Sequence, residues 1–152
     1  MIPALPCLFL FVLLNRSFAG DAVVIGYNAD GVWTAVTYYA SSTPKGGDDY
    51  REMADARNAA LRDLKKRAGG QMVRSEVLSE SDSTGYVAVA RGKTERSADV
   101  TVVGRGSSQS GADEEAFAQL NQAGAAAHQK VVYRFFSFGL ESYQKRQPDR
   151  AN

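Results

Sequence analysis

Four acidic side chains, Asp48, Asp49, Glu52 and Asp55, gather where a helix is expected to begin. On a helix, Asp48, Glu52 and Asp55 fall at i, i+4 and i+7, so their carboxylates would share a face and could bind a cation or act as paired acids. Acidic residues in a first helical turn also complement the helix dipole, and Asp49 with Glu52 makes a capping box. Capping is the simpler interpretation, and we predict no metal site here.

His128 is the only histidine, and we expect it just past a second helix, where a cationic side chain suits the helix dipole. Metal ligation there would need several carboxylates to converge, because Cys7 is the only cysteine. No Gly-x-Ser-x-Gly elbow supports a nucleophilic serine. We therefore predict no catalytic residues; the alternative is a carboxylate-dependent hydrolase that uses Asp48 or Glu52 with His128.

The glycine-rich segment 104–111 follows a predicted strand and precedes a predicted helix, as phosphate-binding loops do. Position 109 is Gln where a dinucleotide fingerprint needs a third glycine, and no Gly-Lys-Ser/Thr sequence is present for a P-loop. Asp113, Glu114 and Glu115 are expected in the first turn of the helix, where they would repel a phosphate. We predict no cofactor, and a flexible or bulged strand end instead.

Aromatic residues mark two of the predicted strands, with Trp33, Tyr38 and Tyr39 in one and Tyr133, Phe135, Phe136 and Phe138 in the other. Alternation along the second of these strands places Arg134 and Phe136 on the face opposite Tyr133 and Phe135. Trp, Tyr and Arg are the residue types enriched in binding hot spots. We predict a binding surface of Trp33, Tyr39, Arg134 and Phe136 on a sheet face that the helices leave open. Burial of this face by loops, the tail or a second subunit is the alternative.

The elements that must position these residues occur in the same predicted order in two parts of the chain, residues 22–78 and 86–138. The order in each part is two strands, a helix and a third strand. In each half a polar or glycine-containing turn joins the first two strands, and small and apolar residues recur at helical spacing in the helix. Neither half could bury its helix alone. We therefore predict an α+β domain in which two β-β-α-β repeats form one sheet of about six strands with both helices on one face.

The second of these repeats carries four distinctive segments: Tyr86-Val-Ala-Val-Ala90, Val102-Val-Gly-Arg-Gly106, Glu115-Ala-Phe-Ala-Gln-Leu120 and Val131-Val-Tyr-Arg-Phe135. This succession resembles a family of secreted bacterial domains of unknown function, and residues 32–78 look like a looser copy of it. The resemblance implies export and a β-β-α-β fold, and it implies no activity or catalytic residues. The cysteines that members of the family commonly carry after the helix and in the last strand are absent here.

Residues 1–19 have the pattern of a secretory signal peptide. An apolar run, Leu8–Leu14, is followed by small residues at Ser17 and Ala19, immediately before Gly20. The run is too short to span a bilayer, which takes about 20 apolar residues. We predict cleavage after Ala19 and a secreted or periplasmic protein without a stable membrane anchor.

The charges of the chain nearly cancel, with 18 Lys and Arg against 17 Asp and Glu. Loss of Arg16 with the leader brings the formal charge from +1 to 0, so no global field attracts nucleic acid. Loss of Cys7 leaves a domain that packing alone must hold together. The length suits one domain, which we predict over 20–139, followed by a flexible tail over 140–152.

Together these features predict an exported, non-enzymatic binding module for a protein or glycan of the envelope or extracellular space. An inhibitor of a secreted hydrolase is one concrete version, by analogy of architecture. Besides the hydrolase named above, the alternative is a self-associating structural protein that forms a homodimer through an edge strand or an open sheet face.

Overall fold

The computed structural model describes residues 20–40 and 53–139, and within them the fold is α+β with two α-helices and two three-stranded antiparallel sheets. The elements in chain order are β1 (Asp21–Tyr27), β2 (Trp33–Ala40), α1 (Met53–Ala68), a short 3-10 turn η1 (Gly69–Gln71), β3 (Arg74–Ser81), β4 (Gly85–Lys93), β5 (Asp99–Gly106), α2 (Gln109–Gln122) and β6 (Ala127–Ser137). The strand order is β2-β1-β3 in the first sheet and β5-β4-β6 in the second.

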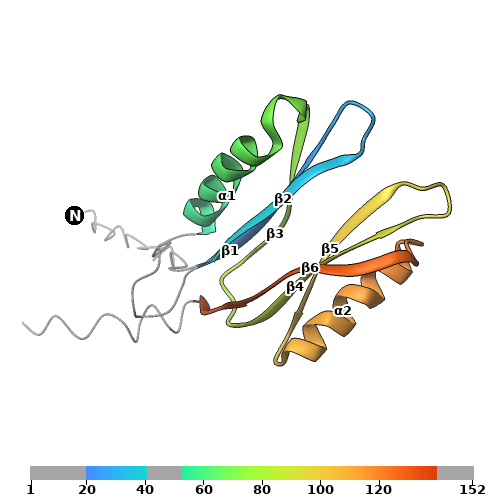
Figure 1. Cartoon of the computed structure of the whole chain (residues 1–152). Coiled ribbons are helices and arrows are strands. Elements are labelled where there is room, and N and C mark those ends of the chain that lie inside the picture. Colours follow the sequence, from blue (N-terminus) through green and yellow to red (C-terminus); the bar gives the residue numbers. More distant parts are fainter. Residues whose placement is uncertain (1–19, 41–52, 140–152) are drawn as a thin grey trace, which may run out of the picture.

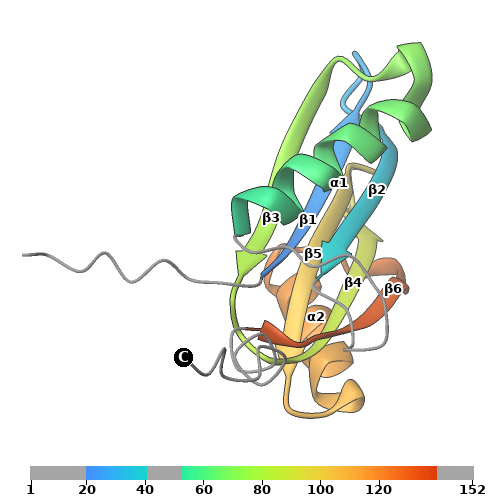
Figure 2. The same cartoon turned by 90° about the vertical axis from the view of Figure 1, so that its left-hand side faces the viewer.

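The two sheets pack face to face, and each helix covers the outer face of one sheet (Figure 1). The layers therefore run α1, first sheet, second sheet, α2. Figure 2, turned by 90°, shows α1 lying along the strands of its sheet. The core between the sheets is made of alternate residues of the strands, among them Val23, Ile25, Val36 and Val89.

The prediction of one sheet with both helices on the same face is wrong. Every residue of β1 is buried, and so are Val87 through Ala90 of β4, so both faces of each central strand need an apolar cover. A single sheet with one helical layer would leave Val23, Ile25 and Val89 in water. Splitting the strands into two sheets gives each central strand a helix on one side and the other sheet on its opposite side.

Small side chains bring both helices close to their strands. Each helix presents two alanines and a leucine, spaced four residues apart and fully buried: Ala56, Ala60 and Leu64 in α1, and Ala112, Ala116 and Leu120 in α2. Ala60 and Leu64 pack with Val24 and Ala35, and the three residues of α2 pack with Ala88 and Ala90.

The glycines at the end of β5 are needed because α2 lies directly on this strand. A Cβ atom on Gly104 would meet the backbone of Ala112 and Ala116, and one on Gly106 would lie 2.6 Å from the amide nitrogen of Ala112. The strand pairs with β4 in unbroken register as far as Gly106, so the prediction of a bulged strand end is wrong.

The second helix also begins earlier than predicted. It starts at Gln109, and Ser108 caps it by accepting a hydrogen bond from the Gly111 amide at 3.1 Å. Asp113 and Glu114 therefore lie in the second turn, and the prediction that these acids occupy the first turn is wrong.

Two arginines of the second sheet join it to the first at opposite ends of the interface. Arg105 donates both terminal nitrogens to the fully buried carboxylate of Asp21, with Nη1 3.0 Å from Oδ2, and it also donates to Ser79 at 2.8 Å. Arg91 stacks on the indole of Trp33 at 3.9 Å and donates to Asp99 at 2.8 Å.

A methyl group added at Gly104 tests the close approach of α2. We expect Gly104→Ala to lower the free energy of unfolding by about 1–3 kcal/mol or more, because α2 must move away from β5. Chemical denaturation followed by circular dichroism measures the change. Gly70→Ala is the control, since a Cβ there meets nothing within 4 Å, and an equal loss in both variants would contradict this account of Gly104.

The two hairpin turns differ in the residue that holds a left-handed backbone: Gly31 has φ 74° and Ser97 has φ 61°. A left-handed residue with a side chain costs roughly 1–2 kcal/mol, so we expect Ser97→Gly to raise the melting temperature and Gly31→Ala to lower it. Calorimetry measures both. The same direction of change in both variants would show that backbone conformation does not decide stability at these turns.

Candidate functional site

The helix side of the second sheet is only partly covered. Helix α2 lies across β5 and β4 and has few contacts with β6, which forms one edge of this sheet. On this side β6 presents Arg134 and Phe136, and Phe138 follows just beyond the strand. We call Tyr86, Arg134, Phe136 and Phe138 the β6 ledge.

Three aromatic rings form the apolar part of the β6 ledge. Tyr86 of β4 lies directly opposite Phe136 of β6, and their ring centroids are 4.9 Å apart with the planes at 79°. Phe136 meets Phe138 at 4.8 Å and 69°. All three side chains are half-buried. Edge-to-face contacts of this kind hold the rings in fixed orientations while part of each ring stays open to solvent.

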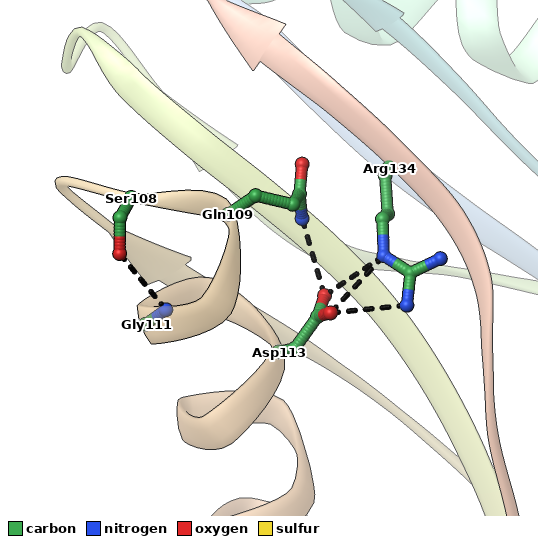
Figure 3. A network of polar contacts seen from close by, with 5 residues as sticks. All are labelled: Ser108, Gln109, Gly111, Asp113 and Arg134. Carbon is green, nitrogen blue, oxygen red and sulfur yellow. Dashed lines mark hydrogen bonds and ion pairs between the residues drawn. The ribbon is translucent and has the colours of Figure 1, made fainter.

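Arg134 forms the polar part of the ledge, and Asp113 of α2 holds it in place (Figure 3). Arg134 Nε lies 3.1 Å from both carboxylate oxygens, and Nη2 lies 3.0 Å from Oδ2. Gln109 donates to the same carboxylate at 3.1 Å. The remaining terminal nitrogen of Arg134 points away from Asp113 (Figure 3), so the guanidinium has a donor that it does not use on this partner.

The ion pair positions the guanidinium more than it stabilises the fold. The Arg134 side chain is 52% exposed and that of Asp113 is 20% exposed. Exposed pairs of this kind contribute little to the free energy of unfolding because water screens them. The hydrogen bond from Arg134 is the main cause that lowers the pKa of Asp113 below its ordinary value; burial opposes it, and Gln109 adds to it.

The four residues predicted to form one binding surface are not brought together. The face that was expected to be open is the one buried between the sheets, and Trp33 lies there, half-buried under Arg91. Arg134 and Phe136 lie on the opposite, helix side of the other sheet. The Tyr39 backbone pairs with Ala22 in the first sheet, and its side chain lies outside what the structure describes.

The residues are separated because the strands form two stacked sheets and not one continuous sheet. Alternation correctly separated Arg134 and Phe136 from Tyr133 and Phe135, which pack between the sheets. The face that carries Arg134 and Phe136 is the helix side, however, and not the helix-free side that was predicted. The sequence did not identify Tyr86 and Asp113 as their neighbours. Tyr86 can be identified as a neighbour only when the register of β4 with β6 is known, and Asp113 only when the start of α2 is known.

The other candidate residues form no second site in the described part of the chain. His128 lies near the start of β6, exposed and with φ 54°, and Asp55 is exposed on α1. Asp48, Asp49 and Glu52 lie outside the described residues, as do the predicted leader and tail. Residues 20–40 and 53–139 contain no group of His, Cys, Asp and Glu side chains that could hold a metal ion.

Neither α1 nor α2 has the length and apolar content that crossing a bilayer requires. No family model, curated protein or solved structure matches the chain.

The pKa of Asp113 tests the ion pair. Because this pKa is lowered in the folded protein, the pair adds stability above the carboxyl's unfolded pKa, and this contribution is lost as the pH falls through the folded pKa. We expect Arg134→Met to raise the pKa of Asp113 towards its ordinary value and to reduce this acid-side loss of stability. A carboxyl-carbon NMR titration measures the pKa.

Asp63 is the internal control for this titration. Burial tends to raise the pKa of Asp63, but hydrogen bonds from Arg67 and Thr37 outweigh it and the net shift is downward. Arg134→Met should leave Asp63 unchanged. An unchanged pKa at Asp113 would mean that Arg134 does not hold this carboxylate in solution.

Proposed function

We propose that the chain is an exported, non-enzymatic binding module that holds an extended, acidic segment of a partner protein along the β6 ledge. The observation that carries this proposal is the arrangement of Arg134 beside three partly open aromatic rings on an edge strand.

The edge position of β6 supports an extended partner. Within residues 20–40 and 53–139, β6 pairs with β4 alone, so its other edge has no strand beside it. A peptide that adds there would gain main-chain hydrogen bonds, and alternate side chains would reach the helix side of the sheet. Those side chains would meet Phe136 and Arg134 in turn.

The chemistry of the ledge supports an acidic and apolar sequence. Asp113 fixes the Arg134 guanidinium before binding, which lowers the entropy lost when a ligand carboxylate is bound. Arg is suited to this role because its planar group can bind two carboxylates at different edges. The rings supply apolar contact area next to this charge, and aromatic residues with Arg are typical of binding hot spots.

Export is part of the proposal and rests on the leader pattern of residues 1–19. Strand β1 begins at Asp21, so cleavage after Ala19 would remove none of the described strands. The partner would then be a protein of the envelope or the extracellular space.

Binding to the ledge is tested with tagged protein on a displayed library of random linear peptides. We expect enriched peptides to combine an acidic residue with apolar residues at alternate positions. Arg134→Ala and Phe136→Ala should each weaken the binding of an enriched peptide at least tenfold, the size expected for a hot spot. Isothermal calorimetry measures the affinities.

Arg57→Ala is the matched control, because Arg57 joins α1 to Glu80 of β3 by a similar exposed ion pair at 3.2 Å in the other half of the molecule. It should leave the affinity unchanged. Peptides that bind all three variants equally would contradict the proposed site. Enrichment of neutral or basic peptides would contradict the acidic partner.

A further inference from the structure

We infer that residues 20–40 with 53–81, and residues 85–139, are two copies of one β-β-α-β unit packed about a two-fold axis, and that the ion pair between Asp21 and Arg105 makes the inner face of each sheet fit the other copy and not a second copy of itself. The interaction surface is the inner face of each sheet, and the partner that it fits is the other half.

The hairpin turns supply the first correspondence. In the first turn, Asn28 N donates to Val32 O at 2.9 Å, and the Asn28 side chain accepts from Val32 N at 2.9 Å. In the second turn, Thr94 N donates to Ala98 O at 3.0 Å, and the Thr94 hydroxyl accepts from Ala98 N at 3.1 Å. The two turns thus have the same length and share these two hydrogen bonds, with Asn28 equivalent to Thr94.

The third strand of each half is irregular at the same place. The pairing of β1 with β3 shifts between Val23 and Val24, which leaves Leu78 of β3 without an opposite residue. The pairing of β4 with β6 shifts between Val89 and Ala90, which leaves Val132 unopposed. Val23 and Val89 each come five positions before the first turn residue. Leu78 and Val132 both pack into the core between the sheets.

An ion pair links helix to third strand in both halves, with its charges reversed. Arg57 of α1 meets Glu80 of β3 at 3.2 Å, and Asp113 of α2 meets Arg134 of β6 at 3.0 Å. Arg57 and Asp113 each follow the first alanine of the buried Ala-x3-Ala-x3-Leu pattern.

The strand partners of this pair are equivalent too. Glu80 lies opposite Ala22, and Arg134 lies opposite Ala88. Both alanines come six positions before the first turn residue. The place of the ion pair is therefore common to the two halves, although the residue types are exchanged.

The direction of the axis follows from the contacts between the sheets. Asp21, at the start of β1, meets Arg105, which lies opposite Val87 near the start of β4. Trp33, opposite Tyr27 at the end of β1, meets Arg91 near the end of β4. The two central strands therefore run the same way, face to face, which a two-fold axis parallel to the strands produces.

The ion pair at one end of the interface breaks this symmetry. Asp21 and Val87 each come seven positions before the first residue of their turn, so they are equivalent. Ala40 lies opposite Asp21, and Arg105 lies opposite Val87, so Ala40 and Arg105 are equivalent too. The counterparts of Asp21 and Arg105 are thus Val87 and Ala40. Two first halves would bury Asp21 without a cation, and two second halves would place Arg105 against valine. Unpaired buried charge is strongly unfavourable, so only unlike halves fit.

The test uses the full chain with a protease site inserted after Ser83, in the exposed link between β3 and β4. The folded chain is cut and mixed in moderate urea with an isotope-labelled copy, so that halves can exchange between molecules. The mixture is refolded by dilution, and native mass spectrometry measures the masses of the pairs that form. We expect pairs of unlike halves only. The variant Asp21→Val with Arg105→Ala carries the counterpart residue at both positions, and we expect it to form like pairs as well, at a tenth of the total or more.

Each other result would overturn the inference. If the unaltered halves form like pairs, Asp21 and Arg105 do not select the partner. The same conclusion follows if the variant Asp21→Val with Arg105→Ala forms no like pairs. Halves that do not reassemble after cutting, in both proteins, would show that the inner faces of the two sheets do not recognise each other. Asp21→Asn with Arg105→Gln is the second variant: it keeps hydrogen-bonding groups without charge and should also allow like pairs if the buried charge is the selecting feature.

Discussion

The packing of one sheet on the other is the interaction on which the rest of the structure depends. The central strands β1 and β4 are buried on both faces, and a helix can cover only one of them. Val23 and Ile25 of the first sheet are removed from water only because Val89 and its neighbours of the second sheet lie over them. Neither helix–sheet layer has a complete core without the other, so the fold is one unit energetically although it has two sheets.

This packing also determines where a ligand can bind. With both inner faces buried, the remaining sheet surface lies beside the helices, over the third strand of each half, which the helices hardly touch. Only β6 combines this position with aromatic rings and a held guanidinium. Over β3 the corresponding surface carries Val77 and Glu80, so the two halves differ most where they are exposed.

The sequence predicted the order of the elements well and their assembly poorly. Turn residues and short runs rich in apolar, β-branched and aromatic residues located the strands near Val23, Val36 and Tyr133. The choice between one sheet and two depends on whether β3 pairs with a strand of the second half, and local pattern does not contain that contact. The start of α2 was missed by four residues because its first turn, Gln109 to Ala112, carries a serine cap and no apolar stripe.

The candidate site was predicted in part, for the same physical reason. Arg134 and Phe136 follow from the alternation of a single strand, whereas Trp33 was joined to them on the assumption of one continuous face. A face is continuous only between strands of one sheet, and Trp33 belongs to the other sheet. Asp113 was interpreted as a helix-start charge, but its partner Arg134 lies 21 residues away in sequence. Contacts of this separation come from the stacking of layers, and a structure is needed to find them.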